Sequence, residues 1–137
     1  MNNMLGEHDL NPFGFHKWNK KRRLPTMMSP TIITQNSKAK YILGSGGSNR
    51  IRSANIQVIL NLLFKNMNLS EAINAPRVHL EGNTLFHEPG VLIPNEKLKN
   101  IIINSFQNKN LFFGGVNAVN TSEAVGDERR GGVGEIF

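Results

Sequence analysis

The chain has 137 residues, of which 39% are hydrophobic and 19% are charged, so it has the size and composition of one globular domain with a modest core. It contains no cysteine, which excludes disulfides, thiolate nucleophiles and zinc–thiolate sites. The formal net charge is +6 at pH 7, and because no apolar run approaches the roughly 20 residues that span a bilayer, we expect no membrane span.

The first 30 residues are rich in Asn, Gly, Pro and charge and show no period of two or 3.6, which predicts a loop-rich region. So long an irregular stretch is typical of a functional segment or of one that lies against another part of the protein. The segment MNNMLGEHDL has neither a basic n-region nor an apolar h-region, so we expect no signal peptide in this chain and its compartment stays unknown.

A basic cluster, HKWNKKRR, lies within this region at 16–23 and encloses Trp18. Its cationic members are Lys17, Lys20, Lys21, Arg22 and Arg23. Surfaces that bind nucleic acid usually spread basic residues over a whole face, whereas this charge is local, so we expect a solvated loop and no nucleic-acid partner. A non-catalytic interaction module that uses the cluster remains an alternative, and salt-dependent binding to DNA or RNA would support it.

From residue 31 onward the hydrophobic pattern predicts an α+β fold. The segments TIITQ (31–35) and KYILGS (40–45) predict two strands joined by a turn at Asn36-Ser37-Lys38. Residues 49–67 predict a helix whose apolar positions surround most of its circumference, as in a helix enclosed between a sheet and other elements.

Further elements follow in the second half of the chain. Asn68 and Glu71 have the spacing of a capping box for a short helix that ends at Ala75, before Pro76. The runs RVHL and TLFHE predict strands on either side of a turn at 81–83, and residues 111–137 predict short strands between Gly-rich turns. A third helix is predicted from Pro94, with a core-facing stripe of Leu98, Ile101, Ile102 and Phe106.

Three arginines are predicted to have structural roles. Arg77 follows Ala75-Pro76 and is expected to tie the helix end to the sheet, with a substrate-facing role as the alternative. Arg129 and Arg130, before a Gly-Gly pair, are expected to anchor the last strands through carboxylates.

A glycine elbow, GSGGSNR (44–50), leads from the second strand into the long helix. The first amides of a helix have no intrahelical acceptor and carry the positive end of its dipole, so the elbow suits a phosphate or a developing oxyanion. A Walker loop needs Lys and then Ser or Thr after its last glycine, and the dinucleotide fingerprint needs glycine where Asn49 stands. The amides of Gly47 and Ser48 are therefore the natural oxyanion-hole pair, with a plain turn before a buried helix as the alternative.

Several segments occur in the order found in one protein family. They are NNMLGEHDLNP, RRLPTMMSPTII, ILGSGGSNRI, MNLSEAINAPRVH and GDERRGGVG. Together they resemble the γ-glutamyltranspeptidase (glutathione hydrolase) family over essentially the whole chain, residues 1–137, which corresponds to the later, larger part of the small subunit. Residues 1–30 would then be a loop-rich region that contacts substrate, and 31–137 would supply strands and core helices.

The resemblance implies part of an αββα layered N-terminal-nucleophile hydrolase fold. In that family a threonine freed by self-cleavage is the nucleophile, and its own α-amino group is the general base. The threonine attacks γ-glutamyl amides such as glutathione, and water or an acceptor amine resolves the acyl-enzyme.

The resemblance also assigns site residues. Gly47 and Ser48 fall at the two oxyanion-hole amides. Thr26 and Met27 fall where many members have two serines that contact the α-carboxylate and α-amino group, although methionine offers no such donor. Asp9, with Glu7 as the alternative, falls at the acidic position that neutralises the substrate ammonium.

The resemblance implies that other parts of the enzyme lie outside this chain. The family's catalytic threonine and the large-subunit arginine that binds the α-carboxylate have no counterpart here, so we expect the chain alone to be inactive. The large subunit or an upstream segment is the expected partner, and family members are often periplasmic or extracellular. Met27, together with Met4 where Gln or Glu is usual, leaves open a related acylase with a different acyl preference.

Neither a cofactor nor a metal is expected. The four histidines lack a close metal-ligand spacing. They are His8, His16, His79 and His87.

Overall fold

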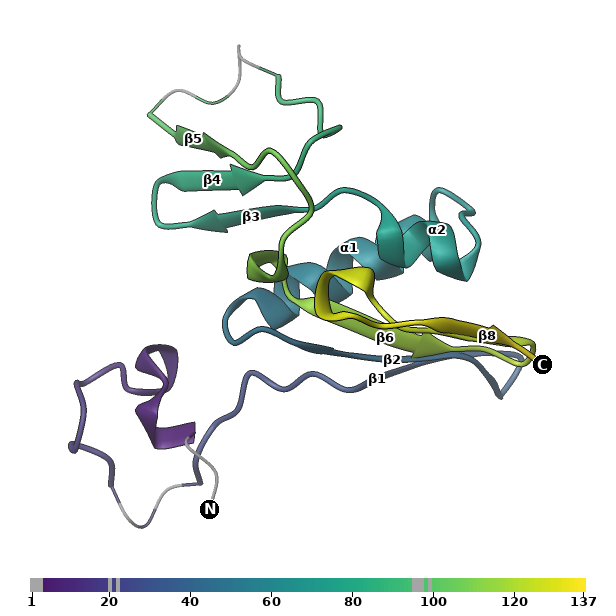
Figure 1. Cartoon of the computed structure of the whole chain (residues 1–137). Coiled ribbons are helices and arrows are strands. Elements are labelled where there is room, and N and C mark those ends of the chain that lie inside the picture. The colour runs from purple at the N-terminus through teal and green to yellow at the C-terminus, as the bar shows by residue number, and fades with distance from the viewer. Residues whose placement is uncertain (1–3, 20, 22, 95–97, 99) are drawn as a thin grey trace.

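The computed structural model describes residues 4–19, 21, 23–94, 98 and 100–137. Within this part, a five-stranded sheet of order β1-β2-β6-β7-β8 carries α1 and α2 on one face, and a separate three-stranded sheet of order β3-β4-β5 extends from the helical side (Figure 1). The elements are β1 (Thr31–Gln35), β2 (Lys38–Gly46), α1 (Arg50–Leu63), α2 (Leu69–Asn74), β3 (Val78–Glu81), β4 (Thr84–His87), β5 (Ile102–Ser105), β6 (Gly115–Val119), β7 (Glu123–Val125) and β8 (Gly134–Ile136). The expected α+β architecture is confirmed.

The predicted hairpin of the first two strands is also confirmed. β1 pairs antiparallel with β2, and the chain reverses at Asn36 and Ser37, whose φ angles are 50° and 62°. Two residues with positive φ give a hairpin turn the twist that its strands require. β2 begins at Lys38 and continues to Gly46, so it leads directly into the glycine elbow.

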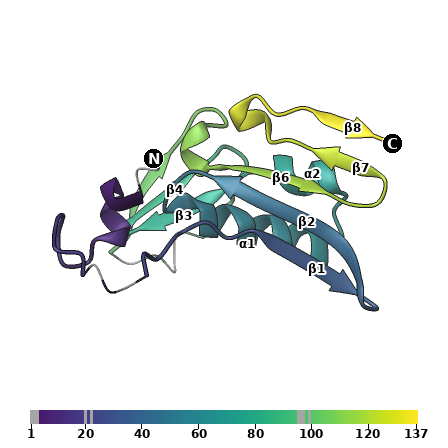
Figure 2. The ribbon, with the colours of Figure 1, turned by 90° about the horizontal axis from the view of Figure 1, so that it is seen from below.

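The long helix forms at the predicted start but ends at Leu63. Ala54, Val58 and Leu62 recur every four residues and pack against Leu43 and Val116 of the large sheet. Figure 2 shows the sheet lying over α1 when the molecule is viewed from the side opposite the helices. The far side of α1 is open within this chain, with Ile56 at 50% exposure, so the helix is covered on one side rather than enclosed on both.

The capping box of α2 is present as predicted. The Asn68 side chain accepts a hydrogen bond from the Glu71 amide at 2.8 Å, and the Glu71 carboxylate accepts one from the Asn68 amide at 3.1 Å. The helix ends at Asn74, and Ala75 is extended because the residue before a proline disfavours helical geometry.

The helix predicted from Pro94 is wrong where the structure describes it. Ile102–Ser105 forms β5, which pairs in parallel with β4, and the side chain of Ile102 is 65% exposed rather than in the core. Residues 95–97 and 99 lie outside the described part. Consecutive isoleucines favour a strand, and the apolar pattern was too short to separate the two periods.

A buried ion network joins the end of α2 to both sheets. Arg129 pairs with Glu88 at 2.5 Å and with Asp127 at 3.1 Å, and Arg77 pairs with Asp127 at 2.6 Å. The structural ties predicted for Arg77 and Arg129 are therefore confirmed. Arg130 forms no ion pair in the described part of the chain and lies instead beside the glycine elbow.

The N-terminal region is loop-rich, as expected. Between residues 4 and 30 its described part contains two short 3-10 turns, Met4–Gly6 and His8–Leu10, and neither strand nor α-helix. Leu10 and Met27 are buried against Ile51, in the first turn of α1. These contacts hold the region beside the start of the helix (Figure 1).

Candidate functional site

The glycine elbow is a tight bend between β2 and α1. Gly47 and Ser48 have φ angles of 136° and 55°, in the region that L residues adopt only with strain. A Cβ atom on Gly47 would stand 2.7 Å from the Cα of Gly114, which is closer than real contacts allow. Glycine at position 47 is therefore required both by the backbone angle and by the approach of the 114–115 turn.

The two elbow amides remain available. The carbonyl oxygens of Gly47 and Ser48 accept hydrogen bonds from the amides of Arg50 and Ile51, each at 3.1 Å. Neither the Gly47 nor the Ser48 N–H donates to an acceptor within the described residues. Two adjacent unpaired donors at a helix start are what stabilisation of a developing oxyanion requires. The Arg130 guanidinium lies alongside, with Nη2 3.6 Å from the position of a Cβ on Gly47, and adds positive charge to this bend.

Glu7 contacts the elbow from the N-terminal region. The Ser48 hydroxyl donates a hydrogen bond to Glu7 Oε2 at 2.6 Å, and the two residues are 41 positions apart. The short distance is typical of a hydroxyl donating to an ionised carboxylate. Of the two acidic candidates, Glu7 is thus bonded to Ser48 at the elbow, and Asp9 is the one that lines the neighbouring cavity.

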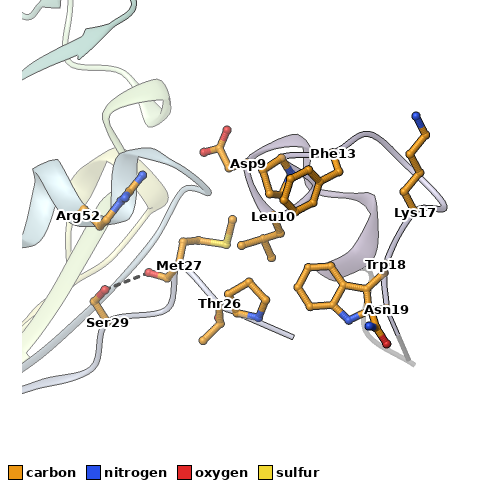
Figure 3. Close-up of a pocket in the computed structure, with 12 residues that line it drawn as sticks. Asp9, Leu10, Phe13, Lys17, Trp18, Asn19, Thr26, Met27, Ser29 and Arg52 are labelled. Atoms are coloured by element: carbon orange, nitrogen blue, oxygen red, sulfur yellow. Dashed lines mark hydrogen bonds between the residues drawn. The ribbon is translucent and has the colours of Figure 1, made fainter. Parts of the chain in front are cut away.

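A cavity of about 380 Å³ lies between the N-terminal region and α1 (Figure 3). The residues that line it are Asp9, Leu10, Pro12, Phe13, Lys17, Trp18, Asn19, Pro25, Thr26, Met27, Ser29 and Arg52. Asp9 and Arg52 place opposite charges on its walls, and Leu10, Phe13 and Trp18 make much of the remainder apolar. Opposite charges around an apolar interior suit a zwitterionic group attached to a hydrocarbon chain.

Thr26 and Met27 both reach this cavity but differ in character. Thr26 is exposed, and its hydroxyl oxygen accepts a hydrogen bond from the Met28 amide at 3.1 Å. Met27 is 7% exposed and packs against Leu10, and its carbonyl accepts a hydrogen bond from the Ser29 hydroxyl at 3.0 Å (Figure 3). At these two neighbouring positions the cavity wall therefore has one hydroxyl and one apolar thioether.

The sequence patterns did not single out Arg52 or Ser29 as site residues. Arg52 lies in the first turn of α1, directly after the elbow, and this place in the chain was the available signal. The basic cluster contributes Lys17 and Trp18 to the cavity wall, whereas Lys20 and Arg22 lie outside the described part.

Within the described residues, no three His, Asp or Glu side chains are arranged to hold a metal ion. In the same part of the chain, no helix has the length and hydrophobicity needed to cross a bilayer.

Comparisons with known proteins identify relatives of this chain. The chain is 43% identical over 58 residues to a glutathione hydrolase proenzyme of a Pseudomonas species (strain A14), and 36% identical over 70 residues to an acylase ACY 1 proenzyme of another (strain V22). The matched segments cover 42% and 51% of this chain but only 10% and 12% of those relatives. The chain thus spans a small part of the curated relatives that it matches.

The structure is similar to that of the gamma-glutamyltranspeptidase from Pseudomonas nitroreducens in complex with L-DON, with a TM-score of 0.70 at 25% identity. The superposition covers 88% of this chain and 67% of that one, and it confirms the expected N-terminal-nucleophile hydrolase fold. The sequence also matches the profile of the family described as Gamma-glutamyltranspeptidase over residues 1–137. The chain therefore belongs to the gamma-glutamyltranspeptidase family.

Proposed function

We propose that this chain is the segment of a γ-glutamyl amide-processing enzyme that supplies the oxyanion hole and part of the substrate headgroup site. The observation that carries the proposal is the pair of unpaired amides at Gly47 and Ser48, at a bend that only glycine permits at position 47. These amides donate hydrogen bonds to the oxygen of the tetrahedral intermediate as negative charge develops on it. Similarity to glutathione hydrolase proenzymes supports γ-glutamyl amides as the substrate class.

The headgroup contacts follow from the cavity beside the elbow. Asp9 pairs with the substrate ammonium, and the Thr26 hydroxyl donates a hydrogen bond to the α-carboxylate. Met27 packs beneath the aliphatic part of the acyl group, and Glu7 fixes Ser48 so that the second amide keeps its direction.

The reacting groups come from the rest of the enzyme in this proposal. A threonine hydroxyl outside the chain attacks the γ-carbonyl carbon, its proton passes to the threonine's own amine, and the leaving amine departs protonated. Water or another amine then cleaves the ester. The large subunit or an upstream segment is therefore the proposed partner, and the chain alone leaves γ-glutamyl amides intact.

A second candidate function is an acylase that prefers a different acyl group. It is favoured by the buried Met27 in a largely apolar cavity and by the similarity to an acylase ACY 1 proenzyme. In this alternative the elbow has the same task, and the cavity accepts an acyl chain without an α-amino acid headgroup.

The two candidates are separated by one assay. The chain is mixed with a polypeptide that carries the threonine and the large subunit, and hydrolysis of γ-glutamyl anilide is compared with hydrolysis of simple aliphatic acyl anilides. Preference for the γ-glutamyl anilide supports the leading proposal, and preference for the aliphatic anilides supports the acylase. Hydrolysis of neither substrate, by this mixture and by the full-length enzyme, would contradict both.

A further inference from the structure

Arg50 connects the glycine elbow to the segment that leads into β6. It is the first residue of α1, and its backbone amide donates a hydrogen bond to the Gly47 carbonyl oxygen at 3.1 Å. Its side chain reaches the 3-10 turn Leu111–Phe113, where Nε donates a hydrogen bond to the Phe112 carbonyl oxygen at 3.1 Å, across 62 positions of sequence. The main chain of Arg50 therefore closes the elbow, while its side chain holds a distant turn against it (Figure 1).

The Arg50 guanidinium makes two further contacts. It lies over the Phe112 ring, with its central carbon 4.9 Å from the ring centroid, a distance at which a cation is attracted to an aromatic face. Its Nη1 donates a hydrogen bond to the side-chain oxygen of Asn49 in the elbow. Because the guanidinium is planar, it stacks on the ring while its edge donates hydrogen bonds. Together these contacts fix both the place and the orientation of the Arg50 side chain.

The Phe112 ring is itself held in an aromatic cluster beside the three-stranded sheet. Its centroid lies 4.8 Å from that of Phe86 in β4, 5.3 Å from that of Phe106 and 5.1 Å from that of Phe113. Aromatic rings attract one another when their centroids are about 4.5–7 Å apart. The cluster therefore gives Arg50 a well-packed support outside the large sheet.

His79 in β3 lies at the edge of this cluster, with its ring centroid 6.0 Å from that of Phe112. Its buried Nε2 atom forms no hydrogen bond within the described residues. Burial lowers the pKa of His79 and the charge of Arg50 adds to that effect, whereas Glu81 opposes it. The ring is therefore neutral at neutral pH and does not repel the Arg50 guanidinium.

The segment that Arg50 holds also touches the elbow directly. The Cα of Gly114 would stand 2.7 Å from a Cβ atom on Gly47. On its other side, the segment is tied to the buried ion network, because Nη1 of Arg77 donates hydrogen bonds to the carbonyl oxygens of Phe113 and Gly114 at 3.3 and 3.4 Å. Arg50 is thus the side chain of the elbow that keeps it against an anchored segment.

We propose that Arg50 is a positioning residue for the oxyanion hole. By holding the elbow against Phe112, it keeps the amides of Gly47 and Ser48 directed at the point where the tetrahedral oxyanion forms. The inference rests on the proposed function, because the direction of these amides matters to the reaction only if an oxyanion binds them. Donors with a fixed direction stabilise the charge of the transition state more than they stabilise the bound substrate. Loss of the Arg50 contacts should therefore lower kcat and leave KM nearly unchanged.

The test measures kcat and KM for γ-glutamyl anilide in the full-length enzyme. Rates are expressed per molecule of self-cleaved enzyme, counted on a denaturing gel, so that a defect in folding or maturation does not lower the measured kcat. Arg50→Met should reduce kcat about tenfold and leave KM within about twofold, a smaller loss than the hundredfold or more that removal of an oxyanion donor causes. Arg50→Lys keeps a positive charge over the ring and should recover most of the lost kcat.

Phe112→Leu is the second variant, and it carries the test where Arg50→Met does not fold. It removes the ring but keeps the backbone carbonyl, so kcat should fall about two- to fivefold, the value of one cation–π contact. The double variant should have no lower kcat than Arg50→Met, because both changes remove the same contact. Lys65→Met and Phe64→Leu are the matched controls, since both side chains are exposed beyond the end of α1, and each should leave kcat unchanged.

The outcomes separate this inference from the proposed function. An unchanged kcat in Arg50→Met and Phe112→Leu, or a rise in KM alone, would overturn the positioning role while wild-type hydrolysis leaves the proposed function intact. Absence of γ-glutamyl anilide hydrolysis in the wild-type enzyme would overturn the proposed function and the positioning role with it.

Discussion

Glu88 and Arg129 form a two-point ion pair between fully buried side chains that are 41 positions apart in the sequence. Nε of Arg129 donates to Oε1 of Glu88 at 2.7 Å, and Nη2 donates to Oε2 at 2.5 Å. The same carboxylate accepts the backbone amides of Arg77 and Asn110 at 3.0 and 3.1 Å. One side chain thus holds the start of β3, the end of β4 and the approach to β6 together, which keeps the elbow's partner turn in place.

Loss of the Glu88 charge should destabilise the folded chain. In Glu88→Gln, Arg129 keeps a buried charge without its main partner, and we expect the free energy of unfolding to fall by about 3–5 kcal/mol. Urea unfolding followed by circular dichroism measures the change. The control is Glu128→Gln, which breaks an exposed ion pair with Lys109 and should cost less than about 1 kcal/mol. Equal losses in the two variants would contradict the structural role of Glu88.

Stability should fall in acid because of Asp127. Burial alone would raise the pKa of Asp127, but Arg77 and the amides of Val116 and Arg129 outweigh it and hold the pKa below its ordinary value of 3.8. A depressed folded-state pKa gives stability that is present above the unfolded value and is lost as the pH falls below it through the folded value.

The pH effect is measured by urea unfolding at a series of pH values from about 6 to about 2, across the range in which carboxyl groups titrate. The wild-type midpoint should decline steeply below about pH 4, and Asp127→Asn should start lower and decline less. Parallel pH profiles for the two proteins would show that another group governs the acid sensitivity.

The close approach at the elbow predicts a selective glycine requirement. A methyl group at Gly47 meets Gly114 at 2.7 Å and also sits at an unfavourable φ, so Gly47→Ala should destabilise the chain by about 2–4 kcal/mol. In the full-length enzyme it should also reduce kcat about a hundredfold or more, because an oxyanion donor is displaced.

Gly44, in β2 three residues before Gly47, is the matched control. A Cβ atom there meets nothing within 4 Å, and the φ angle is ordinary, so Gly44→Ala should change stability by less than about 1 kcal/mol and leave kcat within about twofold. Similar behaviour of the two variants would mean that the elbow is not a tightly fixed bend.

Position 27 should set acyl preference in the full-length enzyme. Met27→Ser introduces a hydroxyl donor where the cavity has a thioether, so kcat/KM for γ-glutamyl anilide should rise relative to aliphatic acyl anilides by about tenfold, the value of one good hydrogen bond. The lost burial should cost about 2–4 kcal/mol of unfolding free energy.

Met28→Ser is the control for that exchange, because the Met28 side chain is 55% exposed and does not line the cavity. It should leave both the substrate preference and the stability nearly unchanged. A shift of preference in Met28→Ser as large as in Met27→Ser would argue against the cavity as the acyl site.

Much of the framework could be predicted from local patterns. The β1–β2 hairpin, the start of α1 and the capping box at Asn68 and Glu71 each depend on residues within a few positions of one another, and all three are present. The prediction of a third helix was wrong because β5 forms by pairing with β4, a strand that is distant in the sequence. A pattern of neighbouring residues does not show that pairing.

The sequence by itself determined the glycine elbow, its place at a strand-to-helix junction and the family to which the chain belongs. Each of these can be recognised from short segments of consecutive residues, without knowledge of how the segments pack together. Only the tertiary structure decided that Glu7 binds Ser48 while Asp9 faces a cavity with Arg52, and that His79 keeps an unpaired nitrogen. The physical reason is that hydrogen bonds and cavities depend on distances of a few ångströms between groups far apart in the chain, and packing of the whole molecule sets those distances.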